Sequence, residues 1–117
     1  MIQHQHLEDF TCIFITDEEH RGIIQVLIPY RTKDKPLDGE ADAFIYSLWV
    51  GEWYRGRGVA KHLMEAAERE LKCCGIATVA ISWDGRDSPP WVLQWYERLG
   101  YEEKASDYRC CTLLKRL

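Results

Sequence analysis

The chain has 117 residues, a length typical of one domain with a single core. Apolar residues make up 46% and charged residues 29%, as in globular proteins, and no apolar run approaches the ~20 residues of a membrane span. The net charge of −4 argues against a nucleic-acid-binding surface, which needs clustered Lys and Arg. No signal-peptide core follows Met1, so we expect a cytoplasmic protein with one domain over residues 1–117.

The five cysteines form neither a recognisable disulfide framework nor a zinc motif. Their odd number and the adjacent pairs at 73–74 and 110–111 fit poorly with disulfides, and no Cys-x-x-Cys is present. We expect reduced, mostly buried thiols and no metal site. His4 and His6 lie in a polar N-terminal tail, for which a frayed end is a better interpretation than a metal contact.

The first third of the chain predicts two strands joined by a turn. Residues 10–16 are apolar and β-branched, and residues 23–28 are again apolar after a polar segment that ends in Gly22. The short connection implies an antiparallel hairpin. Residues 31–40 are charged and contain a proline and a glycine, which predicts a loop.

A strand and a helix form the centre of the chain. Residues 43–50 are rich in aromatic and β-branched residues, which predicts a third strand. A helix is predicted to begin at Val59, with Gly75 following its last turn in a left-handed cap. The face expected to be buried comprises Val59, Leu63, Ala66, Ala67, Leu71 and Cys74. The face expected to be exposed comprises Lys61, Glu65, Glu68 and Lys72.

Residues 76–83 are almost wholly apolar, as expected for a strand covered on both faces. With the preceding strand and helix they form a βαβ unit, in which the two strands run parallel. Residues 84–87 then predict a turn, and Ser88 a helix N-cap with Pro89 at the first helical position. Apolar residues recur at helical spacing before Gly100, at Val92, Trp95, Tyr96 and Leu99.

Residues 108–117 predict a final strand, paired with residues 101–104. The elements therefore follow the order β-β-β-α-β-α-β(β). This order predicts an α/β fold with a mixed sheet, and no repeat or linker divides the chain.

Residues 54–60 read Tyr-Arg-Gly-Arg-Gly-Val-Ala and connect the third strand to the helix. The first N–H groups of a helix need acceptors, which Ser, Thr, Asp or Asn usually supplies, and this segment has none of them. Glycines let the backbone approach a ligand closely, and the helix dipole and two arginines favour an anion such as phosphate. The segment lacks the patterns of a P-loop and a Rossmann turn. A tight turn with two solvated arginines is the alternative interpretation.

The segment resembles the Gln/Arg-x-x-Gly-x-Gly/Ala signature of the GNAT family of N-acetyltransferases. Here it reads Arg55-x-x-Gly58-x-Ala60, with Leu48-x-Val50 in the preceding strand. In that family the loop amides bind the pyrophosphate of acetyl-coenzyme A (acetyl-CoA), and the strand end pairs with the pantetheine arm. The resemblance implies acetyl-CoA as cosubstrate, bound by Leu48, Val50, Arg55, Gly56, Arg57, Gly58, Val59 and Ala60.

A second segment resembles the same family. Residues 95–101, Trp-Tyr-Glu-Arg-Leu-Gly-Tyr, are similar to the family's aromatic-Tyr-Glu-Lys/Arg-Leu-Gly-Phe/Tyr stretch after its fifth strand. Two matches in the expected order imply the acyl-CoA N-acyltransferase-like fold. Pro89 stands where many members have an asparagine that helps to hold the pantetheine arm.

Tyr96 is the candidate general acid. In many members of the family a tyrosine at this position gives a proton to the leaving thiolate. An unperturbed phenol, with a pKa of about 10, stays protonated at neutral pH and can donate. The alternative interpretation is a half-buried aromatic residue on an amphipathic helix.

Asp42 is the candidate general base. In a regular strand it would share a face with Tyr46, Leu48 and Val50, and it could take the proton of the amine directly or through water. A solvated carboxylate at the end of a strand is the alternative. The oxyanion donor implied by the resemblance is the amide of Val50, and weaker candidates for the base are Glu40 and Glu52.

The N-terminal third departs from the family, whose members usually begin with a strand and two helices that wall the acceptor site. No helical pattern precedes Val59, so these helices are expected to be absent. The chain has a surplus of acidic residues, among them Glu18, Glu19, Glu40 and Asp42. They favour a cationic amine as the acceptor, and a solvated acidic surface explains them equally well.

The resemblance implies an enzyme that moves acetyl from acetyl-CoA to a primary amine of a small molecule or protein. Two alternatives stay open: a non-catalytic acetyl-CoA-binding regulatory or interaction module, and an interaction domain without coenzyme. No nucleic-acid or membrane partner is expected. Five tryptophans and the missing helices favour exposed apolar surface and hence a homodimer.

Overall fold

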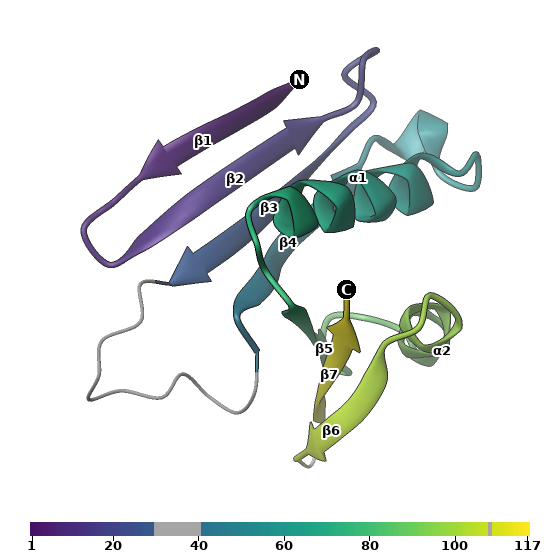
Figure 1. Ribbon diagram of the computed structural model, residues 1–117. Helices are drawn as coiled ribbons and strands as arrows, with labels where there is room; N and C mark the ends of the chain where they lie inside the picture. The colour runs from purple at the N-terminus through teal and green to yellow at the C-terminus, as the bar shows by residue number, and fades with distance from the viewer. Residues whose placement is uncertain (30–40, 108) are drawn as a thin grey trace.

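The computed structural model describes residues 1–29, 41–107 and 109–117. The predicted loop at 31–40, with Glu40, and Tyr108 lie outside the described residues. Within them the elements, drawn in Figure 1, are β1 (Ile2–His6), β2 (Phe10–Thr16), β3 (Gly22–Pro29), β4 (Ala43–Val50), the 3-10 helix η1 (Glu52–Tyr54), α1 (Val59–Cys73), β5 (Thr78–Asp84), α2 (Pro90–Arg98), β6 (Glu102–Ser106) and β7 (Cys110–Arg116).

The described strands form one seven-stranded sheet in the order β1-β2-β3-β4-β5-β7-β6. β4 and β5 run parallel, and every other neighbouring pair is antiparallel. The predicted hairpin, the βαβ unit and the pairing of the last two strands are therefore confirmed, and the fold is the mixed α/β arrangement expected from the sequence.

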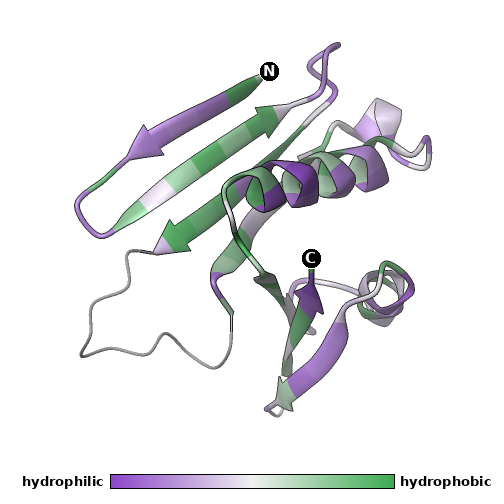
Figure 2. Cartoon of the chain, viewed as in Figure 1, coloured by the Kyte–Doolittle hydropathy of each residue, from purple (hydrophilic) through white to green (hydrophobic). Residues whose placement is uncertain are grey.

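Both α-helices pack on the same face of the sheet. Figure 2 shows predominantly hydrophobic strands β2 and β3 and, on α1, hydrophobic residues alternating with hydrophilic ones. The core between α1 and the sheet includes Ile13, Ile24, Val26, Ala43, Ile45, Val59, Leu63, Met64, Ala67, Leu71, Val79 and Leu113. Leu93, Trp95 and Tyr96 of α2 and its C-cap Leu99 pack against the same core. A smaller cluster lies on the other face and comprises Ala41, Phe44, Ala80 and Leu114.

The N-terminal segment is a strand and not the frayed tail expected from its sequence. β1 pairs with β2 from Ile2 opposite Ile15 to His6 opposite Thr11. The amide of Leu7 donates to the carbonyl of Phe10 at 2.9 Å, which closes a tight turn between the two strands. Thus no helix separates β1 from β2, and the expectation of missing acceptor-side helices is confirmed for residues 1–29.

A β-bulge interrupts the regular alternation of β4. Ser47 lies opposite Gln25 and Ile45 lies opposite Val26, so Tyr46 is the extra residue. The bulge moves Leu48 and Val50 to the helix-covered face, where both pack with Ile45. The expectation that Asp42 shares a face with Leu48 and Val50 is therefore wrong, because one inserted residue reverses the alternation.

The ends of the two helices differ in part from the prediction. Gly75 has a φ of 78° and follows the last turn of α1, as predicted, and the amide of Ile76 donates to the carbonyl of Leu71 at 3.0 Å. Helix α2 begins at Pro90 with Pro89 as its N-cap, so the predicted N-cap at Ser88 is wrong. Pro89 is extended because the residue before a proline avoids the helical region.

The thiols are free, and they are more exposed than predicted. Cys12 is buried, Cys110 and Cys111 are half-buried, and Cys73 and Cys74 at the end of α1 are exposed. The buried face of α1 includes Met64, which was not predicted, and it does not include Cys74, which was. The expectation of mostly buried thiols is therefore wrong, because Cys12 alone of the five is buried.

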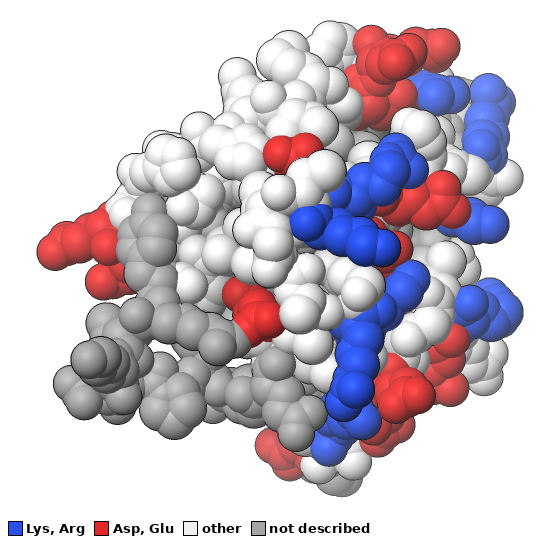
Figure 3. Space-filling view, viewed as in Figure 1, with Lys and Arg blue, Asp and Glu red and all other residues white. Residues whose placement is uncertain are grey.

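The surface combines charged and apolar regions. On the face seen in Figure 3, basic side chains form a band interspersed with acidic ones, and the part over β1 to β3 is nearly without charge. Several large apolar side chains are exposed, among them Tyr46, Trp49, Trp53 and Trp91. Among the described residues, neither helix is both long and apolar enough to cross a membrane.

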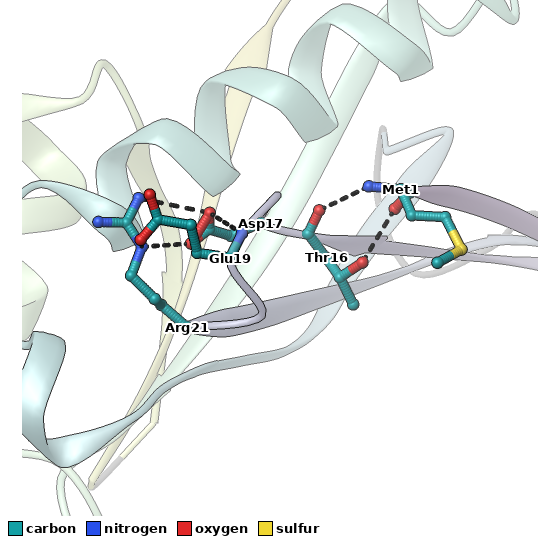
Figure 4. Close-up of polar contacts among 5 residues, drawn as sticks. All are labelled: Met1, Thr16, Asp17, Glu19 and Arg21. Atoms are coloured by element: carbon teal, nitrogen blue, oxygen red, sulfur yellow. Dashed lines mark hydrogen bonds and ion pairs between the residues drawn. The ribbon is translucent and has the colours of Figure 1, made fainter.

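An ion pair orders the turn between β2 and β3. Figure 4 shows Arg21 beside Asp17, with the guanidinium Nε donating to the carboxylate at 2.6 Å. At the neighbouring end of β2, the N-terminal ammonium of Met1 donates to the carbonyl of Thr16 at 2.8 Å. The carbonyl of Arg21 accepts the amide of Gly51 at 2.7 Å, so this turn also anchors the end of β4.

We expect the Asp17–Arg21 pair to make the stability of the folded protein fall at acidic pH. The hydrogen bond from Arg21 lowers the pKa of Asp17 below its ordinary value of 3.8, against the opposing effect of burial. A lowered folded-state pKa gives stability above pH ~4 that is lost as the pH falls through the folded value. Asp17→Asn should therefore unfold at lower urea than the wild type at pH 7, with a smaller difference at pH 3. An equal difference at both pH values would contradict this account.

Candidate functional site

A cleft of about 660 Å³ opens between the C-terminal half of β4 and the start of α1 on one side, and β5 and α2 on the other. The two predicted motifs, which are far apart in the sequence, both contribute to its walls. Its lining includes Ser47, Leu48, Trp49, Val50, Tyr54, Arg55, Gly56, Gly58, Val59, Ala60, Lys61, Ser82, Asp87, Ser88, Trp91, Val92, Trp95 and Tyr96.

The cleft exists because the two parallel strands separate. Pairing between β4 and β5 runs from Ala43 opposite Val79 to Ile45 opposite Ile81, and among the described residues it stops there. Both strands continue beyond that point. The bulge at Tyr46 coincides with the end of the pairing, and bulges bend the strand that carries them. The β4 backbone beyond Tyr46 therefore borders an open space on the side of β5.

The backbone groups of Leu48 and Val50 face this space. The amide of Gly51 donates to the carbonyl of Arg21, the residue before β3. In an antiparallel pair, successive residues direct their N–H and C=O groups alternately toward the partner and away from it. Val50 and Leu48 therefore direct theirs away from β3, toward the gap beside β5. The Val50 carbonyl accepts the Nε of Arg55, so an extended ligand in the gap could pair with the backbone groups of Leu48 and the N–H of Val50 as a further strand would.

The turn before α1 presents backbone donors to the same cleft. Gly56 and Gly58 have φ angles of 78° and 82°, a left-handed conformation that favours glycine. Gly58 is the N-cap of α1, and no side chain among the described residues caps this end. The first turn of α1 also carries no acidic residue. The uncapped N–H groups and the positive end of the helix dipole therefore have the chemistry that an anion at the cleft wall would need.

Basic side chains lie beside this helix start. The Nε of Arg55 donates to the carbonyl of Val50 at 3.1 Å, which ties the turn to the end of β4. Lys61 also lines the cleft, whereas Arg57 is exposed and outside the lining. Asp87 contributes one negative charge on the opposite wall. Of the eight predicted coenzyme-binding residues, all except Arg57 are thus brought together at the cleft.

Tyr96 lies on the wall opposite the glycine turn. It is half-buried on α2, with its ring centroid 5.6 Å from that of Trp95 and 6.5 Å from that of Tyr101. Burial raises the pKa of the Tyr96 phenol above its ordinary value of 10. Its hydroxyl makes no hydrogen bond with the residues that the structure describes. A protonated phenol with a free donor therefore lines the same cleft as the uncapped start of α1.

Asp42 lies away from these groups. It precedes β4, where its amide donates to the carbonyl of Thr78 at 3.2 Å and to the Thr78 hydroxyl at 3.0 Å. It is half-buried and is not part of the cleft lining. The alternation of β4 places it on the face opposite α1. The structure therefore does not bring Asp42 into the cleft beside Tyr96.

Several residues of the cleft were missed by the sequence analysis, among them Ser47, Trp49, Lys61, Asp87, Ser88 and Trp91. The spacing in α2 contained a signal for one of them. Trp91 precedes Trp95 by one helical turn, as Val92 precedes Tyr96, so these four residues form a continuous surface. For Ser47 and Trp49 the signal was hidden, because the bulge changes which side chains reach the gap.

Comparison with known proteins agrees with this geometry. A family model described as the acetyltransferase (GNAT) family matches residues 2–101. An acetyltransferase structure from Agrobacterium tumefaciens is 22% identical, with a TM-score of 0.67 over 99% of this chain and 76% of that chain. The PaiA N-acetyltransferase from Thermoplasma acidophilum in complex with coenzyme A is 17% identical, with a TM-score of 0.66 over 93% of this chain and 62% of that chain.

A third structure of the same fold is the ribosomal-protein alanine N-acetyltransferase from Escherichia coli. It is 18% identical, with a TM-score of 0.66 over 95% of this chain and 71% of that chain. These similarities show the acyl-CoA N-acyltransferase fold, and the family model covers most of the chain. The protein therefore belongs to the GNAT family of acetyltransferases.

Proposed function

We propose that the protein is an N-acetyltransferase that moves the acetyl group of acetyl-CoA to a primary amine of a small molecule or protein. One observation supports this most: the uncapped, glycine-started N-terminus of α1 and the phenol of Tyr96 line one cleft, at the point where β4 and β5 separate. The first group suits a pyrophosphate, the free backbone of β4 suits a pantetheine arm, and the phenol suits a leaving thiolate.

Each proposed role follows from the chemistry of acetyl transfer. The amine nitrogen attacks the thioester carbonyl carbon, a C–N bond forms, and the C–S bond breaks. The amide of Val50 is our candidate donor to the oxyanion that develops on the carbonyl oxygen. The thiolate takes a proton from Tyr96, which regains one from solvent. Asp42 stays our candidate for the proton of the amine, and from its position it would act through water.

The compared proteins support a coenzyme A substrate and leave the acceptor open. The Thermoplasma structure contains coenzyme A, and the Escherichia coli enzyme acetylates an alanine of a ribosomal protein. Exposed carboxylates near the ends of the strands, such as Glu18 and Glu19, favour a cationic amine here.

An amine panel tests the proposed activity. Purified protein, acetyl-CoA and cationic, neutral and peptide amines would be assayed by release of free thiol. We expect thiol release that depends on the amine and a product heavier by one acetyl group. Saturable acetyl-CoA binding without turnover for any amine would instead indicate the non-catalytic module. Absence of binding would exclude both functions.

We also expect two copies of the chain to associate. Trp49, Trp53 and Trp91 are 54%, 85% and 63% exposed, which is unusual for side chains of this size. Light scattering at micromolar concentration should give the mass of a homodimer. A monomer mass over the whole concentration range would contradict the expectation.

A further inference from the structure

A cluster of three chemically different side chains lies at the C-terminal end of α1, at the end of the helix opposite the cleft. One ring nitrogen of His4, a carboxylate oxygen of Glu70 and the Sγ of Cys74 all lie within 4.8 Å of one another. The His4 ring and the Glu70 carboxylate are 2.8 Å apart. The side chains of His4 and Glu70 are 33% and 23% exposed, so both are partly shielded while solvent can still reach them.

The fold itself brings these residues together. His4 lies opposite Ile13 in the β1–β2 ladder, and opposite residues direct their side chains to the same face. Ile13 is part of the core beneath α1, so His4 faces the helix. Glu70 and Cys74 are one helical turn apart and therefore lie on the same side of α1. An edge strand and a helix end thus contribute to one cluster.

We propose that His4, Glu70 and Cys74 bind one Zn²⁺ ion. Imidazole, carboxylate and thiolate are the three ligand types that Zn²⁺ takes in proteins. Bond lengths of a tetrahedral site would place the ligand atoms roughly 3.3 to 3.6 Å apart, so small side-chain rotations from the present positions suffice. Cys74 loses its thiol proton to solvent on binding, and water completes the fourth position. The alternative is a His4–Glu70 hydrogen bond beside a thiol that the helical spacing places near Glu70, and a thiolate–metal band separates the two.

The ion would act as a clamp between β1 and α1. β1 is an edge strand of exposed residues, and on the helix side it meets α1 through the His4–Glu70 contact. The 15 residues of α1 separate this site from the glycine turn by about 20 Å. Zinc binding should therefore raise the melting temperature without changing the affinity for acetyl-CoA.

Cobalt substitution tests the site directly, because a thiolate ligand to Co²⁺ gives a charge-transfer band that imidazole and carboxylate do not. Untagged, reduced and metal-free protein would be titrated with Co²⁺ and then with Zn²⁺. We expect one ion per chain, a thiolate band that Zn²⁺ removes, and a higher melting temperature. Cys74→Ser should abolish the band, and His4→Ala should weaken Zn²⁺ binding at least ~100-fold, the upper range for loss of an outer-sphere partner.

Two matched controls identify the ligands. Cys73→Ser removes the adjacent exposed thiol, which lies outside the cluster, and His6→Ala removes the other histidine of β1, whose Nδ1 is 3.0 Å from the Thr11 hydroxyl. Both controls should bind Zn²⁺ within about twofold of the wild type. The proposal is overturned if the native chain shows no thiolate band, or if the controls lose as much affinity as His4→Ala and Cys74→Ser. All four residues are at the surface or on the edge strand, so the variants should stay folded.

Discussion

Replacing Tyr96 with phenylalanine should lower the turnover number ~10²- to 10⁴-fold, the usual contribution of a positioned general acid. The change removes one oxygen, whose hydroxyl makes no hydrogen bond within the described residues, so stability should change by less than about 1 kcal/mol. Acetyl-CoA affinity should stay nearly constant, because the glycine turn lies on the other wall of the cleft. Because burial raises the pKa of the phenol, its ionisation should reduce the wild-type rate only above pH 10.

Tyr101→Phe is the matched control for this prediction. Tyr101 lies beside Tyr96, is 1% exposed, and donates its hydroxyl to Glu68 at 2.9 Å. Its substitution should cost about 1.5–3 kcal/mol of unfolding free energy, the range for a hydrogen bond to a charged group, and leave turnover within a few-fold. Chemical unfolding and steady-state kinetics with an acceptor from the amine panel measure both effects. Wild-type turnover in Tyr96→Phe would remove Tyr96 from the mechanism.

Gly58→Glu should lower the affinity for acetyl-CoA roughly 1000-fold. A carboxylate would lie where the uncapped N–H groups of α1 are proposed to hold phosphate. Two unit charges 4 Å apart interact by about 4 kcal/mol at an effective dielectric constant of 20. Gly58 has a φ of 82°, so any side chain also strains the backbone, by about 1–2 kcal/mol. No atom lies within 4 Å of an added Cβ, so the core should stay intact.

Two controls separate charge from strain. Gly58→Ala carries the same strain without the carboxylate and should keep most of the affinity. Gly75→Glu adds the same charge at the other end of α1, where φ is 78° and a Cβ again meets no atom within 4 Å. Calorimetric titration should find near-normal binding in Gly75→Glu. Equal binding by Gly58→Glu and the wild type would exclude the helix start as the phosphate site.

Much of the fold could be predicted because local patterns agreed with tertiary packing. The apolar, β-branched run of residues 10–16, the amphipathic spacing of α1 and the glycine after it each dictate one local structure. β1 and β6 could not be predicted as readily, because every residue of both strands is exposed and their pairing with a neighbour defines them. In β1, the repeat Ile2, His4, His6 does alternate with glutamines, but histidine carries little strand signal.

The candidate site also contains residues that could be predicted from the sequence and residues that could not. The glycine turn and the helix that carries Tyr96 are continuous segments, so each could be predicted from its resemblance to a family motif. The gap between β4 and β5 depends on the bulge at Tyr46, which no local pattern indicates, and the bulge also moved Asp42 to the opposite face from Leu48. The cluster of His4, Glu70 and Cys74 was equally hidden, because it joins the first strand to the end of α1.

Amide NMR of isotope-labelled protein titrated with acetyl-CoA tests the proposed site most directly. We expect saturable shifts for Leu48, Val50 and residues 56–60, and little change at Gly75. Acetyl-pantetheine, which lacks the pyrophosphate, should shift Leu48 and Val50 but leave residues 56–60 nearly unchanged. Shifts that do not saturate, or that fall outside the cleft formed by β4, α1, β5 and α2, would contradict an acetyl-CoA site at the start of α1.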